Sequence, residues 1–275
     1  MLTYIIFFAV SIIASTIGAI CGVGGGVFMK PALDAVNVLP VNTITFLSTC
    51  TVIAMTSYNV ITTATSSNGN DNHLIDWKLT TWLGIGSALG GIIGKDIYTH
   101  IKNSFFNPDI VGSYQAVALL LTVALTLLYT VNKKRIRGLH VNHPVLLILL
   151  GLALGTISSF VGIGGGPMNL AVLYFFLSMS TKTAAQNSLY ITLISQTSSL
   201  LMTFFKGSVP VEILSGNLGI WIMLIGMMIC GVCGGKIGKM LNRRLSSETV
   251  DKLFIILCLV IMLLCVWNIF TKSGI

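Results

Sequence analysis

The chain has 275 residues, of which 54% are hydrophobic and only 9% are charged, and its formal net charge is +8. The mean hydropathy of +0.90 excludes a soluble globular enzyme, because so few charges cannot solvate a surface of this size. It also excludes a disordered chain, which needs low hydrophobicity and a high charge density. The basic residues gather between apolar runs, as they do in membrane proteins, so no nucleic-acid partner is expected.

Eight apolar segments are long enough to cross a bilayer, because about 20 helical residues span its hydrocarbon core. These segments lie at 2–21, 41–64, 79–98, 110–131, 145–162, 183–205, 217–240 and 250–270. Two further apolar segments, 27–38 and 167–179, are too short to cross. Each of the two directly follows a glycine run that should break a helix. The sequence therefore predicts an all-α polytopic membrane protein with ten helical segments.

The glycine runs mark an internal repeat. They read GVGGG at 22–26 and GIGGG at 162–166, which are 140 residues apart. Further matches in the same order are Thr43 with Thr183, Ser48 with Ser188, Trp82 with Trp221, and GGIIGK at 90–95 with GGKIGK at 234–239. We therefore expect a first repeat at 1–131, a basic linker at 132–143 and a second repeat at 144–275.

The basic residues of the loops indicate that the two repeats are inverted. If each short segment returns the chain to the side it came from, four loops share one side with 11 Lys and Arg, against 4 on the other. These loops are 65–78, 132–143, 180–182 and 236–252. If only the long helices cross, the basic residues divide almost evenly, so the positive-inside rule favours the inverted arrangement. We expect the linker in the cytoplasm, the chain in a bacterial inner membrane and both termini outside. Re-entrant hairpins and full crossings of the short segments stay open.

Helices broken within inverted repeats are typical of transporters. Where the chain re-enters a helix, backbone N–H groups and the positive end of the helix dipole point towards the break. Such a helix start binds an anion without requiring a charged side chain. Pro167 suits the first position of a helix and supports a start directly after Gly166. The glycines predicted to bind the anion are Gly24, Gly25, Gly26, Gly164, Gly165 and Gly166.

Polar side chains near the breaks are further candidates for the anion site. Lys30 either faces the anion, snorkels to the membrane interface or pairs with Asp34. Asn169 either donates its amide to an anion oxygen or has a capping or packing role. The remaining candidates follow in the next long helices, with interhelical hydrogen bonding as the alternative role. They are Ser48, Gln186, Asn187 and Ser188.

The two glycine runs and the residues after them carry a family resemblance. GVGGG at 22–26 is followed by Pro31-Ala32-Leu33, and GIGGG at 162–166 is followed by Pro167. This pair of motifs resembles the TauE/SafE family, also called the toluene sulfonate uptake permease family, over essentially the whole chain. The resemblance implies a transporter, exporter or permease, of small sulfur-containing anions such as sulfite or an organosulfonate. Lys30 and Asp34 depart from the family pattern, in which the first short helix is usually apolar.

Two other functions remain open. Cys230 and Cys233 form a CxxC motif, which leaves a membrane thiol-disulfide oxidoreductase as one alternative. An anion channel of the same fold is the other. The histidines and cysteines lack metal-ligand spacing, so we predict no metal site. We also expect no cofactor and no enzymatic activity. The expected partners are a small anionic substrate and the lipid bilayer, and a homo-oligomer is compatible with the sequence. The sequence leaves open which anion is carried, in which direction and with which coupling ion.

Overall fold

The computed structural model describes residues 2–36, 38–65, 74–104, 108–133, 138–161 and 165–272. Within these ranges it is built from α-helices and contains no β-strand. The helices are α1 (Leu2–Cys21), α2 (Gly26–Val36), α3 (Val41–Ala64), α4 (Trp77–Ser104), α5 (Pro108–Asn132), α6 (Pro144–Val161), α7 (Gly166–Leu177), α8 (Thr181–Phe205), α9 (Val211–Leu214), α10 (Leu218–Arg244) and α11 (Ser247–Lys272). The all-α fold class predicted from the sequence is confirmed.

Each of the ten predicted segments corresponds to a helix. The largest differences are in α4 and α10, which extend past their predicted ends to Ser104 and Arg244. The single turn α9 is additional and follows Pro210. Seven helices of the described chain are long and apolar enough to cross a membrane, where eight were predicted. The exception is α4, whose uncharged stretch runs only from Leu79 to Gly94, between Lys78 and Lys95, and contains several glycines and threonines.

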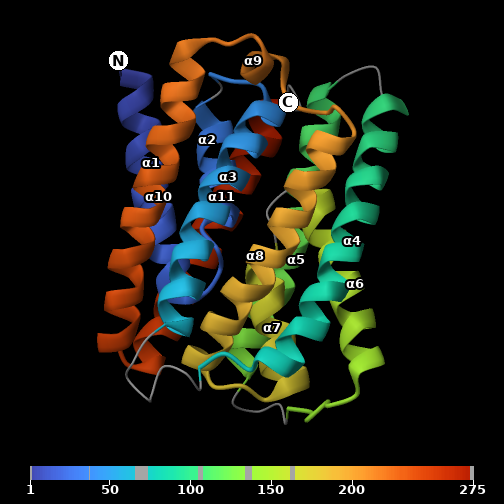
Figure 1. Cartoon of the computed structure of the whole chain (residues 1–275), viewed down its shortest axis with the longest axis vertical. Helices are drawn as coiled ribbons and strands as arrows, with labels where there is room; N and C mark the ends of the chain where they lie inside the picture. Colours follow the sequence, from blue (N-terminus) through green and yellow to red (C-terminus); the bar gives the residue numbers. More distant parts are fainter. Residues whose placement is uncertain are drawn as a thin grey trace.

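The two ends of the molecule carry different loops. In Figure 1 the N-terminus, the C-terminus and α9 lie together at one end, which we call the terminal end. The described residues of the linker and the turns before α8 and α11 lie at the other end, which we call the linker end. The path from α1 to α2 enters from the terminal end and turns back, and the path from α6 to α7 enters from the linker end and turns back. The two broken paths therefore enter from opposite ends of the molecule.

The short helices α2 and α7 are about half as long as the helices that could cross a membrane. They contain 11 and 12 residues, which cover only about 16–18 Å at the helical rise. Neither length crosses a hydrocarbon core of about 30 Å. These lengths favour re-entrant hairpins over two further full crossings.

The long helices form two bundles. The first bundle contains α1, α3 and α10, and the second contains α4, α6 and α8 (Figure 1). The two bundles meet where α3 contacts α8, and α5 packs on α11 beside them. Each bundle therefore combines helices from both halves of the chain.

Glycine allows the closest helix contacts within each bundle. A β-carbon added at Gly90 of α4 would lie 2.1 Å from the backbone oxygen of Leu152 in α6. In the first bundle, a β-carbon at Gly238 of α10 would lie 2.3 Å from the backbone oxygen of Thr16 in α1. Small residues that let two backbones approach are a main source of helix association in membranes. These contacts hold the two bundles as compact units.

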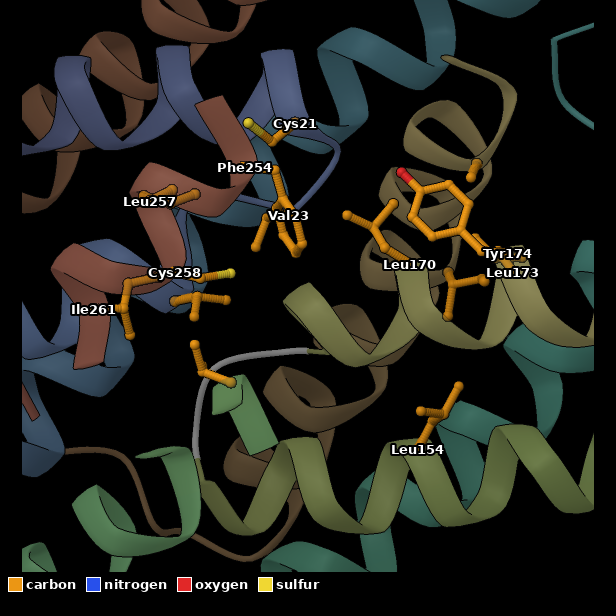
Figure 2. Packing of buried hydrophobic residues seen from close by; sticks show 14 of the residues in the cluster. Cys21, Val23, Leu154, Leu170, Leu173, Tyr174, Phe254, Leu257, Cys258 and Ile261 are labelled. Atoms are coloured by element: carbon orange, nitrogen blue, oxygen red, sulfur yellow. The ribbon is translucent and has the colours of Figure 1, made fainter. Parts of the chain in front are cut away.

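Buried apolar side chains fix the position of the first glycine break. Figure 2 shows Val23, within that break, among Phe254 of α11 and Leu170 of α7. All three side chains are buried, and they belong to one cluster with Leu257 and Cys258 of α11. The break therefore lies inside the protein, where unpaired backbone groups are protected from lipid.

Candidate functional site

The first break is a left-handed turn made by glycines. Gly22, Gly24 and Gly25 have φ angles of 77°, 77° and 67°, a conformation that residues with a β-carbon rarely adopt. Helix α2 then begins at Gly26, and the N–H of Met29 donates to the backbone oxygen of Gly25 over 3.0 Å. The predicted helix start after the first glycine run is confirmed.

The second break is described only from Gly165 onward, so Gly164 lies outside the described residues. Gly165 and Gly166 have φ angles of 103° and 37°. Pro167 occupies the first turn of α7, as predicted from the sequence. A β-carbon at Gly165 would lie 2.4 Å from the side-chain nitrogen of Asn169. The amide of Asn169 therefore lies directly over the start of its own half-helix.

The two breaks lie against each other, both directly and through Thr192 of α8. A β-carbon at Gly24 would lie 2.9 Å from Thr192 Cγ2, and one at Gly166 would lie 2.1 Å from Val27 Cγ2. Asn169 Nδ2 donates to Thr192 Oγ1 over 3.4 Å. Asn169 is fully buried, and its Oδ1 has no hydrogen-bond partner among the described residues. We call the set formed by Gly24, Gly165, Gly166, Asn169 and Thr192 the break junction.

One face of α8 carries a row of hydroxyl groups through the break junction. Residues spaced by three and four positions share a helix face. We call this row the hydroxyl stripe, and its members are Ser188, Thr192, Ser195, Ser199 and Thr203. Ser188 and Ser195 are buried, and within the described chain their hydroxyl oxygens have no hydrogen-bond partner. Buried hydroxyls without partners are unusual unless water or a ligand satisfies them.

A cavity of about 480 Å³ opens at the terminal end, between the two bundles. It lies among α3, α4 and α8, and Ser199 and Thr203 place the outer part of the hydroxyl stripe on its wall. Its volume corresponds to about 16 water molecules at roughly 30 Å³ each. Ser159 of α6 lines its inner part, and Ser195 lies close to Ser159 beside Gly91. The stripe therefore runs from the cavity towards the break junction.

Lys30 lies at the second break rather than at the membrane interface. Its side chain is only 4% exposed, which excludes snorkelling. Its Nζ donates to the backbone oxygen of Val161 over 2.8 Å and to Gln115 Oε1 over 3.1 Å. Gln115 Nε2 also donates to the backbone oxygen of Phe160 over 2.8 Å. Lys30 and Gln115 thus cap the carboxyl end of α6, where a positive charge opposes the negative end of the helix dipole.

Asn187 is used to tether α4 to α8. Its Oδ1 accepts from the backbone N–H of Asp76, over 3.0 Å, and from the hydroxyl of Thr80. Its Nδ2 donates to the backbone oxygens of Leu74, over 2.8 Å, and Thr183, over 2.7 Å. An amide has two donor hydrogens and two acceptor lone pairs, so its capacity is filled. The geometry favours a structural role for Asn187.

The repeat-matched serines have different surroundings. Ser48 donates to the backbone oxygen of Thr45 in its own helix over 3.0 Å, whereas Ser188 belongs to the hydroxyl stripe. Gln186 lies towards the linker end, where its Oε1 is 3.3 Å from Thr63 Oγ1 across the two bundles. Of the predicted polar candidates, Asn169 and Lys30 therefore lie at the second break, and Ser188 lies one turn before Thr192 on α8.

The sequence analysis did not single out Thr192 or Lys95. Thr192 lies four positions after Ser188 and bridges the two breaks, so helical spacing from Ser188 was the available signal. Lys95 lines the cavity, and it falls within the matched GGIIGK motif. Both signals were present in the sequence, but neither tells which helix face points inward.

A family model described as sulfite exporter TauE/SafE matches residues 7–264. The chain belongs to the TauE/SafE family. Among curated proteins it is similar to the "Probable membrane transporter protein YunE" of Bacillus subtilis (strain 168), with 21% identity over 270 residues that cover 90% of this chain and 92% of that protein. No solved structure matches. The TauE/SafE match and this relative support a multi-pass membrane transporter rather than an enzyme.

The CxxC motif of this TauE/SafE protein lies within α10. All six cysteines are free thiols, Cys233 is exposed on the helix surface and Cys230 is half-buried. Neither residue lines the cavity. Gly234, directly after Cys233, packs on the backbone of Ile12 in α1. The motif therefore lies on a small-residue packing helix, which favours a structural role over the redox alternative.

Proposed function

We propose that this TauE/SafE protein transports a small sulfur-containing oxyanion, such as sulfite or an organosulfonate, by alternating access at the break junction. The observation that carries the proposal is the hydroxyl stripe, which links the cavity at the terminal end to the junction of the two breaks. Its partners are the anion and the lipid bilayer of a bacterial inner membrane.

The chemistry of the break junction suits an oxyanion. The starts of α2 and α7 supply the positive ends of two helix dipoles, and Thr192 supplies a hydroxyl donor. Asn169 can present its NH2 group to an anion after rotation of the amide, because the two ends of an amide are similar in shape. Sulfite and sulfonates carry three oxygens around one sulfur atom, and each oxygen accepts hydrogen bonds. Neutral donors and dipoles bind such an anion without a salt bridge that would hinder release.

The two ends of the molecule differ in a way that supports alternating access. At the terminal end the cavity lies between α3 and α8, which also touch there through the rings of Phe46 and Phe204. At the linker end the same two helices are joined by the contact of Thr63 Oγ1 with Gln186 Oε1 over 3.3 Å. A tilt of one bundle against the other would close the first end and open the second. The excess of basic residues in loops of the linker end favours the cytoplasm for that end, so both termini would lie outside.

Anion uptake into proteoliposomes that contain the purified protein tests this proposal. We expect saturable uptake of sulfite or sulfoacetate and little uptake of sulfate or acetate. Uptake of acetate without uptake of either sulfur anion would refute the substrate class. Flux that rises linearly with concentration at rates far above carrier turnover would instead support the channel.

A pair of asparagine variants locates the site in the same assay. Asn169→Ala removes an amide from the break junction, and Asn132→Ala removes an amide that, within the described residues, donates to Leu128 of its own helix. Loss of a hydrogen bond to a charged group costs about 1.5–3 kcal/mol, so we expect Asn169→Ala to weaken anion affinity about 10- to 150-fold. Equal affinities in the two variants would place the site elsewhere.

A further inference from the structure

A lysine that the break junction does not use lines the cavity. Lys95 is half-buried on α4, and its Nζ donates to the backbone oxygen of Ser199 over 3.2 Å and to the hydroxyl of Thr203. Both partners belong to the hydroxyl stripe and line the same cavity. Among the ion pairs of the described residues, none includes Lys95. On the described wall of the cavity, Lys95 is the cationic group, and the one carboxylate there, Glu212 of α9, accepts from the hydroxyl of Thr43.

A second lysine makes the matching contacts at the other end of the molecule. Lys239 of α10 donates to the backbone oxygen of Asn59 over 3.3 Å and to Thr63 Oγ1 over 2.7 Å. Asn59 and Thr63 on α3 lie 140 residues before Ser199 and Thr203 on α8, which is the offset of the glycine runs. The two lysines themselves end the matched motifs at 90–95 and 234–239. The same constellation therefore occurs twice, once at each end.

The two constellations differ in access. Lys239 is 8% exposed, and Thr63 beside it contacts Gln186 across the two bundles. At the repeat offset of 140, Thr63 matches Thr203 and Gln186 matches Phe46. Thr203 and Phe46 both line the open cavity. At the terminal end Thr203 and Phe46 thus line the cavity, and α3 touches α8 beside it through the rings of Phe46 and Phe204. One lysine is accessible and its counterpart is covered.

We propose that Lys95 and Lys239 are a pair of anion-binding residues, one for each end of the transport path. This inference rests on the proposed function. A small oxyanion that enters from the terminal end binds Lys95 with Thr203 before it reaches the break junction. When the linker end opens, Lys239 and Thr63 bind the anion there in the same way. A cationic group inside a narrow cleft raises the local concentration of anions, because its field is weakly screened there.

Charged thiol reagents test the assignment of Lys95 without requiring a transported substrate. In a full-length cysteine-free protein, Thr49→Cys places a thiol on the cavity wall. Its reaction rates are measured with a sulfonate-bearing and a trimethylammonium-bearing methanethiosulfonate, both added at the terminal end. We expect Lys95→Gln to lower the ratio of anionic to cationic rate by about tenfold, and Lys95→Arg to preserve that ratio.

Lys206 provides the matched control. It is a lysine at the same end, but it is exposed and paired with Asp96. Lys206→Gln should change the ratio at Thr49→Cys far less than Lys95→Gln does. Equal effects of the two substitutions would mean that only general surface charge attracts the reagent, and this result would overturn the assignment of Lys95.

The assignment of Lys239 is tested from the linker end. Gln186→Cys removes the contact with Thr63 and places a thiol in the cleft beside it. We expect Lys239→Gln, or Lys239→Met if the first variant does not fold, to lower the rate ratio at this thiol by about tenfold and to leave the ratio at Thr49→Cys unchanged. An unchanged ratio at position 186, or no reaction there, would overturn the pairing. Absence of anion flux in the wild-type protein would refute the proposed function alone, because the labelling ratios do not depend on flux.

Discussion

Substitution of Gly24 by alanine tests the break junction most directly. The φ angle of 77° at Gly24 is left-handed, and a residue with a β-carbon adopts it at a cost of about 1–2 kcal/mol. The added methyl group would also lie 2.9 Å from Thr192 Cγ2, so Thr192 must shift from its place beside Asn169. If Thr192 donates to the anion, the lost hydrogen bond costs about 1.5–3 kcal/mol, which corresponds to a loss of affinity of about 10- to 150-fold.

Gly216→Ala separates backbone strain from an effect on the site. Gly216 has a φ angle of 67°, and nothing lies within 4 Å of an added β-carbon. Gly216→Ala should therefore lose thermal stability through backbone strain alone, whereas Gly24→Ala should lose at least as much because its methyl group also meets Thr192. Both losses are read from the unfolding temperature in detergent. Only Gly24→Ala should raise the anion concentration needed for half-maximal uptake. If both variants keep wild-type affinity, or lose it equally, the reasoning that places the anion at Gly24 and Thr192 is refuted.

Three further outcomes are expected. Asn187→Ala should lower the unfolding free energy by about 2 kcal/mol or more, because four hydrogen bonds are lost; an unchanged unfolding temperature would contradict its tethering role. Single cysteines that replace His140 and Ser246 should react with a membrane-impermeant maleimide from the same, cytoplasmic side, and reaction from opposite sides would rule out the inverted arrangement. Cys230→Ser combined with Cys233→Ser should leave anion uptake nearly unchanged, whereas an inactive double variant with intact glycines would favour the redox alternative.

The sequence predicted the helices well because their limits have local causes. Bilayer thickness sets the length of the long helices, and the glycine runs end α1 and precede α7 because only glycine adopts the left-handed turn at low cost. Pro167 fixes the start of α7 in the same local way. These causes act within a few residues, so they are visible without knowledge of the packing.

The site was less predictable because it depends on contacts between distant helices. Lys30 reaches Val161, which is 131 residues further along the chain, and Asn187 binds backbone groups near the start of α4. Helices that are apolar on most faces carry little information about their rotation, since packing rather than solvent sets that rotation in a membrane. The matched motifs at 90–95 and 234–239 paired Lys95 with Lys239, but they could not show that one is accessible and the other covered.

The sharing of helices between the bundles has a consequence for biosynthesis. The first bundle needs α10, which is made long after α1 and α3, so it cannot be completed until the chain has been synthesised to about Arg244. Domains generally fold as units during synthesis, starting with the N-terminal one, but here no complete bundle exists in either half. A break within 132–143 would yield two fragments that each lack part of both bundles. Such fragments should therefore be stable only when they are synthesised together and assemble within the same membrane.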